Sequence, residues 1–148
     1  MIPPKETIKI GQVEIHFLLD ADDTGGSLAM FEFVVQPGAR VPAPHYHEGF
    51  DEIAYGLEGV LTFTVDGVPM EIGPGDRHFI PRGAVHHFVN SGTVPSRTLA
   101  VLTPAQIGPA YFRDIAALLA SGPPDPAKMA ETMRRHGLIV VPPGTEQR

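Results

Sequence analysis

The chain has no cysteine among its 148 residues, which excludes disulfide bonds and thiolate metal sites. Any metal ion must therefore be held by nitrogen and oxygen donors. Long apolar runs are also missing, and residues 1–6 lack the apolar segment of a secretory leader. These absences favour a soluble, cytoplasmic protein without a membrane partner.

Basic residues are few, with 11 Lys and Arg against 17 Asp and Glu, which gives a formal net charge of −6. They cluster only at Arg134-Arg135, so the charge pattern argues against a nucleic-acid partner. Hydrophobic residues make up 43% and charged residues 19%, the balance of a globular chain rather than a disordered one. We expect one domain over residues 1–148.

Glycine and proline are abundant, at 16 residues each, and they separate short apolar runs. This pattern predicts many tight turns and an all-β sandwich or barrel, preceded by a loose arm at residues 1–7. Asp66-Gly67 between two apolar runs predicts a type I′ hairpin turn. The expected strands are residues 13–19, 28–35, 52–57, 60–65, 68–72, 78–80, 85–89 and 98–102.

The pattern changes after Pro104. Apolar residues from Tyr111 to Leu119 recur at helical spacing, and a second helix is predicted between Asp125 at its N-cap and Gly137 just past its end. Its apolar stripe, Met129, Met133 and His136, is interpreted as packing on the barrel or on a dimer partner. Residues 138–141 are a candidate edge strand.

The sequence His45-Tyr46-His47 offers two imidazoles on one face of a strand, because strand side chains alternate. Pro42 and Pro44 just before it predict an edge strand or a strand entrance. Three carboxylates follow, Glu48, Asp51 and Glu52, and His86-His87 lies on a later apolar segment. Imidazole and carboxylate together suit a divalent Fe, Mn, Ni, Co, Cu or Zn ion.

The histidines stand in two glycine-punctuated blocks. The first is Gly38, six residues, His45-x-His47, four residues, Glu52, six residues, Gly59. The second is Gly75, five residues, Pro81-x-Gly83, two residues, His86, three residues, Asn90. Together they resemble the two motifs of the cupin superfamily, with one extra residue between Gly38 and His45 and the short spacing of small microbial members.

This resemblance implies a double-stranded β-helix, the cupin jelly-roll barrel, over about residues 8–103, with a helical tail over about 104–148. It implies one divalent metal ion held by His45, His47, Glu52 and His86. The rival carboxylates Glu48 and Asp51 are then expected outside the ligand set. Small cupins commonly dimerise, so a homodimer is expected.

The similarity to quercetin-dioxygenase-like cupins implies a metal-dependent dioxygenase acting on a small flavonol-like, enolisable or phenolic substrate. Glu52 would be both ligand and catalytic base. Phe50, His78 and Phe88 are candidate residues of the substrate pocket. Two alternatives stay open, a non-catalytic ligand-binding or sensing cupin and a metal-dependent isomerase or lyase, because one fold serves many chemistries.

Overall fold

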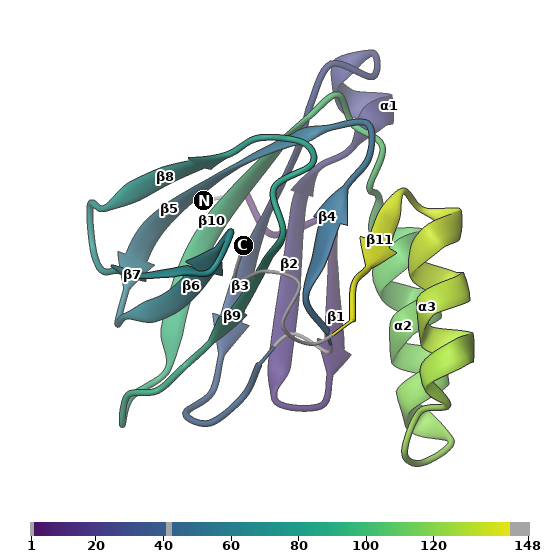
Figure 1. Ribbon diagram of the computed structural model, residues 1–148. Helices are drawn as coiled ribbons and strands as arrows, with labels where there is room; N and C mark the ends of the chain where they lie inside the picture. Colours follow the sequence, from purple (N-terminus) through teal and green to yellow (C-terminus); the bar gives the residue numbers. More distant parts are fainter. Residues whose placement is uncertain (1, 41–42, 143–148) are drawn as a thin grey trace.

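Two antiparallel sheets and two C-terminal helices build the computed structural model, which describes residues 2–40 and 43–142 (Figure 1). In spatial order, the six-stranded sheet is β1 (Glu6–Ile10), β2 (Val13–Leu19), β3 (Ala29–Val35), β10 (Ser96–Thr103), β5 (Asp51–Glu58) and β8 (Arg77–Ile80). The five-stranded sheet is β11 (Leu138–Val140), β4 (His45–His47), β9 (His86–Val89), β6 (Leu61–Val65) and β7 (Val68–Ile72).

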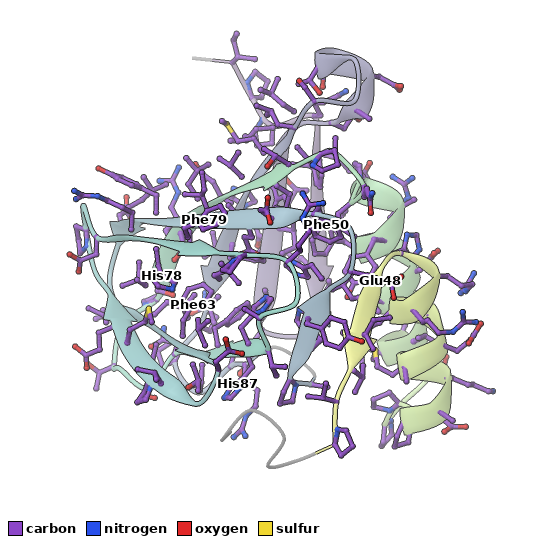
Figure 2. All side chains as sticks on the ribbon, turned by 45° about the horizontal axis from the view of Figure 1, so that its top comes forward. Glu48, Phe50, Phe63, His78, Phe79 and His87 are labelled. Atoms are coloured by element: carbon purple, nitrogen blue, oxygen red, sulfur yellow. The ribbon has the colours of Figure 1, made fainter. Side chains whose placement is uncertain are left out.

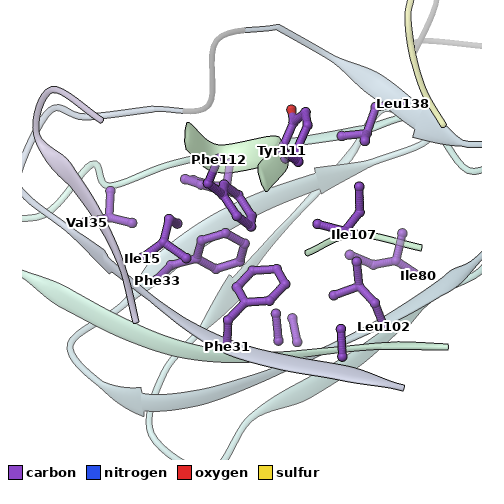
Figure 3. Packing of buried hydrophobic residues seen from close by; sticks show 14 of the residues in the cluster. Ile15, Phe31, Phe33, Val35, Ile80, Leu102, Ile107, Tyr111, Phe112 and Leu138 are labelled. Carbon is purple, nitrogen blue, oxygen red and sulfur yellow. The ribbon is translucent and has the colours of Figure 1, made fainter. Parts of the chain in front are cut away.

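The core lies between the sheets, where alternate residues of each strand turn inward. Along β3, Phe31 and Phe33 are buried while Glu32 between them is half-buried, and Phe63 on β6 is buried in the same way from the other sheet. Such alternation is what a strand with one face on the core requires. Figure 3 shows this packing, which includes Phe112 from the C-terminal helices. The predicted β-rich architecture is confirmed.

Two turns show why glycine occupies particular positions. Asp66 and Gly67 both have positive φ, of 48° and 80°, as the type I′ turn predicted between β6 and β7 requires. Gly59, after β5, has φ of 63°, and a Cβ atom there would lie 2.4 Å from the carbonyl oxygen of Pro95. Any larger residue at Gly59 would therefore clash and be strained.

The two predicted C-terminal helices are present as α2 (Pro109–Ala120) and α3 (Pro126–Arg135). The Asp125 side chain accepts a hydrogen bond from the Ala127 amide and so caps α3 as expected. A short α1 (Ala21–Thr24), capped by Asp20, connects β2 to β3. No helix in the described part of the chain is both long and apolar enough to cross a membrane.

Two predictions need correction. Residues 6 and 7 do not belong to a loose arm, because β1 begins at Glu6 and pairs with β2. Strand β4 is not at a sheet edge, because β11 pairs with it on the side away from β9. The prolines near β4 suggested an open edge, but the returning chain covers it, and Val141 also donates its amide to the Pro44 carbonyl.

Candidate metal centre

Two neighbouring strands bring the three imidazoles together. His45 and His47 share the buried face of β4, and His86 on β9 stands opposite His45 in the strand register. The three rings are at most 5% exposed, and their centroids lie 4.5–5.3 Å apart. One ring nitrogen from each residue lies within 4.8 Å of the others. The cluster can thus direct three nitrogen donors at one point.

Hydrogen bonds fix the orientation of two of these rings. The Nδ1 atoms of His45 and His86 lie 2.9 Å from the carbonyl oxygens of Ala43 and Ala84. A carbonyl can only accept, so in each neutral ring Nδ1 carries the proton and Nε2 presents a lone pair. Backbone partners of this kind are the usual supports of metal-binding histidines.

His47 is held by a different contact. Its ring stacks on Phe50 at a centroid distance of 4.3 Å, and its buried Nδ1 has no hydrogen-bond partner among the described residues. Its Nε2 lies 3.7 Å from Oε1 of Glu52. The stacking therefore orients this ring toward the centre of the cluster without a polar support.

Glu52 reaches the cluster from the opposite sheet. Glu52 is on β5, whereas the histidines are on β4 and β9 of the other sheet. Because Glu52 belongs to a different strand, the alternation along β4 does not decide which way its side chain points. Its Oε1 lies 3.8 Å from Nε2 of His86, beyond hydrogen-bond distance, and Glu52 is only 5% exposed. A buried carboxylate whose charge nothing neutralises is costly, so this geometry favours a bound cation.

Burial dominates the electrostatics of the cluster. It lowers the pKa of His45 to about 3, with help from neighbouring His86, and that of His86 to about 4. Burial and the two neighbouring imidazoles also lower the pKa of His47. Burial raises the pKa of the Glu52 carboxyl to about 8. Neutral imidazoles are the form that binds metal, and a bound cation would compensate the carboxylate charge.

The residues present thus fit a divalent ion. The three histidines form a cluster that can bind a metal, and Glu52 adds an oxygen donor beside it. Nitrogen and oxygen donors of this kind suit several first-row ions and do not select one of them.

The other two carboxylates near the motif lie elsewhere. Asp51 accepts hydrogen bonds from the Arg82 backbone and guanidinium, and this partner lowers the pKa of the Asp51 carboxyl. Glu48 is exposed (Figure 2). Glu52 is the carboxylate that the structure buries beside the imidazoles.

The imidazoles and Glu52 border a cavity of about 130 Å³ between the sheets. Phenylalanines from the strands line it, namely Phe31, Phe33, Phe63 and Phe88. Helix α2 adds Tyr111, Phe112, Ile115 and Leu119. The cavity therefore has a histidine end, defined by His45, His47, Glu52 and His86, and a phenylalanine end, defined by Phe31, Phe33 and Phe112.

The predicted pocket residues divide between two locations. Phe88 is among the residues that line the cavity, whereas Phe50 and His78 are not. Phe50 is fully buried and stacks on the His47 ring. His78 is on the edge strand β8, where it pairs with Ala54 of β5 (Figure 2). The lining residues of α2 were predicted to lie on a helix, but helical spacing alone does not show which helix faces a cavity.

Comparisons with known proteins identify the family of the chain. Residues 31–102, which include all four site residues, match the family model of the cupin domain. The chain is 29% identical to quercetin 2,3-dioxygenase of Bacillus subtilis over 69% of this chain and 30% of that one. It spans about half or less of the length of that enzyme and of two other curated relatives, 30–52%.

Solved structures extend the similarity to the fold. A predicted oxalate decarboxylase from Thermotoga maritima matches with a TM-score of 0.62 and 30% identity, over 69% of this chain and 93% of that one. The polyketide cyclase RemF from Streptomyces resistomycificus matches with a TM-score of 0.56 and 30% identity, over 70% of each chain. The two sheets are thus the jelly roll expected from the sequence, and the chain belongs to the cupin superfamily.

Proposed function

We propose that this cupin is a metal-dependent oxidoreductase of the dioxygenase type, acting on a small phenolic or enolisable organic molecule. The observation that carries the proposal is the convergence of three imidazoles and a buried, unpaired carboxylate at one end of an apolar cavity. The similarity to quercetin 2,3-dioxygenase of Bacillus subtilis supports the reaction type. Both atoms of O₂ would enter the substrate, so no other oxidant is needed.

In this proposal His45, His47 and His86 hold one divalent ion through nitrogen, and Glu52 holds it through oxygen. The ion, when bound, supplies Lewis acidity toward a substrate oxygen. The Ala43 and Ala84 carbonyls keep two of the rings in the tautomer that this role requires.

Glu52 is proposed to act also as the general base. It is the only carboxylate among the described residues that line the cavity, so a phenol or enol bound there would meet it first. The carboxylate would accept the hydroxyl proton and return it to the product. The phenylalanines around the cavity would keep water away from this transfer.

A second candidate is a metal-dependent isomerase or lyase, supported by the 30% identity to the polyketide cyclase. The same four residues would bind the substrate oxygen and move a proton, without O₂. In the third possibility, a non-catalytic ligand-binding cupin, the cavity would hold its ligand unchanged.

Oxygen uptake distinguishes these functions. We expect protein that carries its metal to consume O₂ with a catechol, a flavonol or a β-diketone, and to lose turnover under nitrogen. Glu52→Gln should abolish turnover, whereas His78→Ala, outside the cavity, should retain it. Turnover that continues under nitrogen would replace the dioxygenase by an isomerase or lyase, and bound ligand recovered unchanged would indicate a binding protein.

We also propose that the chain forms a homodimer through the outer face of the six-stranded sheet. Ile53 on β5 pairs with Phe79 on β8, and these side chains are 41% and 54% exposed beside the exposed Tyr55. Neighbouring exposed apolar side chains of this size are typical of interaction surfaces. Sedimentation should give a dimer at micromolar concentration and a monomer for Phe79→Glu, and a wild-type monomer would contradict the proposal.

A further inference from the structure

Helix α2 forms one wall of the cavity that the imidazoles also line. Its Phe112 ring packs edge-on against Phe31 at a centroid distance of 5.0 Å (Figure 3). The same ring lies 6.1 Å from that of Phe17, so the helix contacts the strands through aromatic side chains. Arg113 on the outer side of α2 pairs with Glu6 of β1. The helix is therefore part of the cavity wall and not a separate appendage.

The next helix supports this wall from behind. The Asp114 carboxylate on α2 lies 3.0 Å from Nε2 of His136, the C-cap residue just after α3. The His136 ring also meets Tyr111 edge-on at 5.1 Å. Because α2 is thus held on two sides, the volume beside Phe112 is set by packing and not by a loop that can move freely.

The size and lining of this volume indicate the shape of the ligand. A cavity of about 150 Å³ lined by Leu, Ile and Phe is known to hold one benzene molecule. The cavity of this protein is of similar size, about 130 Å³, and Phe31, Phe33, Phe63, Phe88 and Phe112 all border it. Aromatic side chains favour stacked or edge-on contact with another ring.

We propose that α2 limits the ligand to a single aromatic ring that carries adjacent hydroxyl groups, with Phe112 as the residue that determines specificity. The ring would lie against the phenylalanine end, and its hydroxyl groups would face the histidine end. The inference rests on the proposed function for the position of the oxygens, and on the cavity alone for the size limit. It narrows the substrate class to catechol-sized molecules and excludes three-ring flavonols.

The test measures binding without turnover. The protein is loaded with Zn²⁺, an ion that cannot change its oxidation state, so that no oxidation takes place. It is then titrated under nitrogen with catechol, 2,3-dihydroxynaphthalene and quercetin by isothermal titration calorimetry. We expect the wild type to prefer catechol over quercetin by about tenfold or more, since a pocket rejects groups for which it has no room. Phe112→Ala should reduce this preference by about tenfold by opening the wall.

Leu118→Ala is the matched control, because Leu118 is a partly buried residue of α2 that does not line the cavity. Its ligand preference should equal that of the wild type. If Phe112→Ala does not fold, Phe112→Leu takes its place and should give a smaller shift in the same direction. Equal affinity of the wild type for all three probes, or an unchanged preference in the folded variant, would overturn the size limit.

The size limit and the proposed function can fail separately. Catechol that binds in preference to quercetin but supports no oxygen uptake would retain the size limit and refute the dioxygenase. Oxygen uptake by the wild type with quercetin as substrate would retain the dioxygenase and overturn the size limit.

Discussion

The two ends of the cavity are built in opposite ways. At the histidine end, polar side chains are buried with few partners, and the charged form of Glu52 is disfavoured. At the phenylalanine end, Phe31 contacts Phe17, Phe33 and Phe112 at centroid distances of 5.0–5.1 Å. The first arrangement sacrifices stability for binding, and the second supplies stability. Substitutions at the two ends should therefore change different properties.

The largest effect is expected on metal affinity at the histidine end. His86→Ala removes one of three converging nitrogen donors and should weaken metal binding by about 100-fold or more, since even supporting residues contribute 10–100-fold. Competition with a chromophoric chelator measures this change. His78→Ala serves as the control and should bind like the wild type, because His78 lies on the edge strand β8. Equal metal affinities of His86→Ala and His78→Ala would show that His86 does not bind the metal.

The next effect is expected on stability at the phenylalanine end. Phe31→Ala leaves a void among three rings and should lower the free energy of unfolding by about 3–5 kcal/mol. Metal stoichiometry in the folded variant should stay unchanged. Denaturant unfolding is the measurement, and Val94→Ala, at a residue that is 57% exposed, should change stability by less than about 0.5 kcal/mol. Loss of metal from folded Phe31→Ala would show that the two ends are coupled.

Glu52 should make the metal-free protein sensitive to pH. Burial raises its pKa to about 8 from the ordinary value of 4.5. The folded state therefore binds the proton more tightly, and the stability from this group is complete below pH 4.5 and lost as the pH rises through 8. Glu52→Gln cannot ionise, so it should become the more stable protein above pH 8, by on the order of 1–3 kcal/mol.

Urea unfolding of chelator-treated wild type and Glu52→Gln at pH 5 and pH 8 measures this difference. The advantage of the variant should grow with pH, while its affinity for metal should be lower. Parallel stability curves for the two proteins would show that Glu52 is not buried unpaired.

The smallest effect is expected outside both ends. Asp125→Ala removes the side-chain cap of α3 and should lower stability by about 1 kcal/mol. Thermal unfolding measures the loss, and Asp125→Asn, which keeps a capping oxygen, should restore most of it. Metal affinity should not move in either variant. A changed metal affinity would mean that α3 acts on the histidine end through α2.

The sequence predicted the features that depend on local pattern. Alternation placed His45 and His47 on one face, the Asp66-Gly67 turn followed from its backbone requirement, and the cap of α3 followed from Asp125 and its following proline. These features need only a few neighbouring residues, so they can be inferred before any tertiary contact is known.

Long-range packing was not readable in the same way. Nothing in residues 138–140 indicates that they pair with β4, and nothing in the helical stripe shows that Phe112 faces a cavity. Phe50 was a candidate pocket residue, but its ring stacks on His47 and is not among the residues that line the cavity. Whether a side chain faces the cavity depends on the strands and helices that pack around it, and not on its neighbours in the sequence.

Metal stoichiometry tests the central claim most directly. Untagged, chelator-treated protein titrated with Co²⁺ should develop a visible absorption band that saturates at one ion per chain. The band should be absent from the variant in which His45, His47 and His86 are all replaced by Ala. Saturation at one ion with loss in that variant is the predicted result. No binding by the wild type, or equal binding by the variant, would contradict the assignment of this cluster as the metal centre.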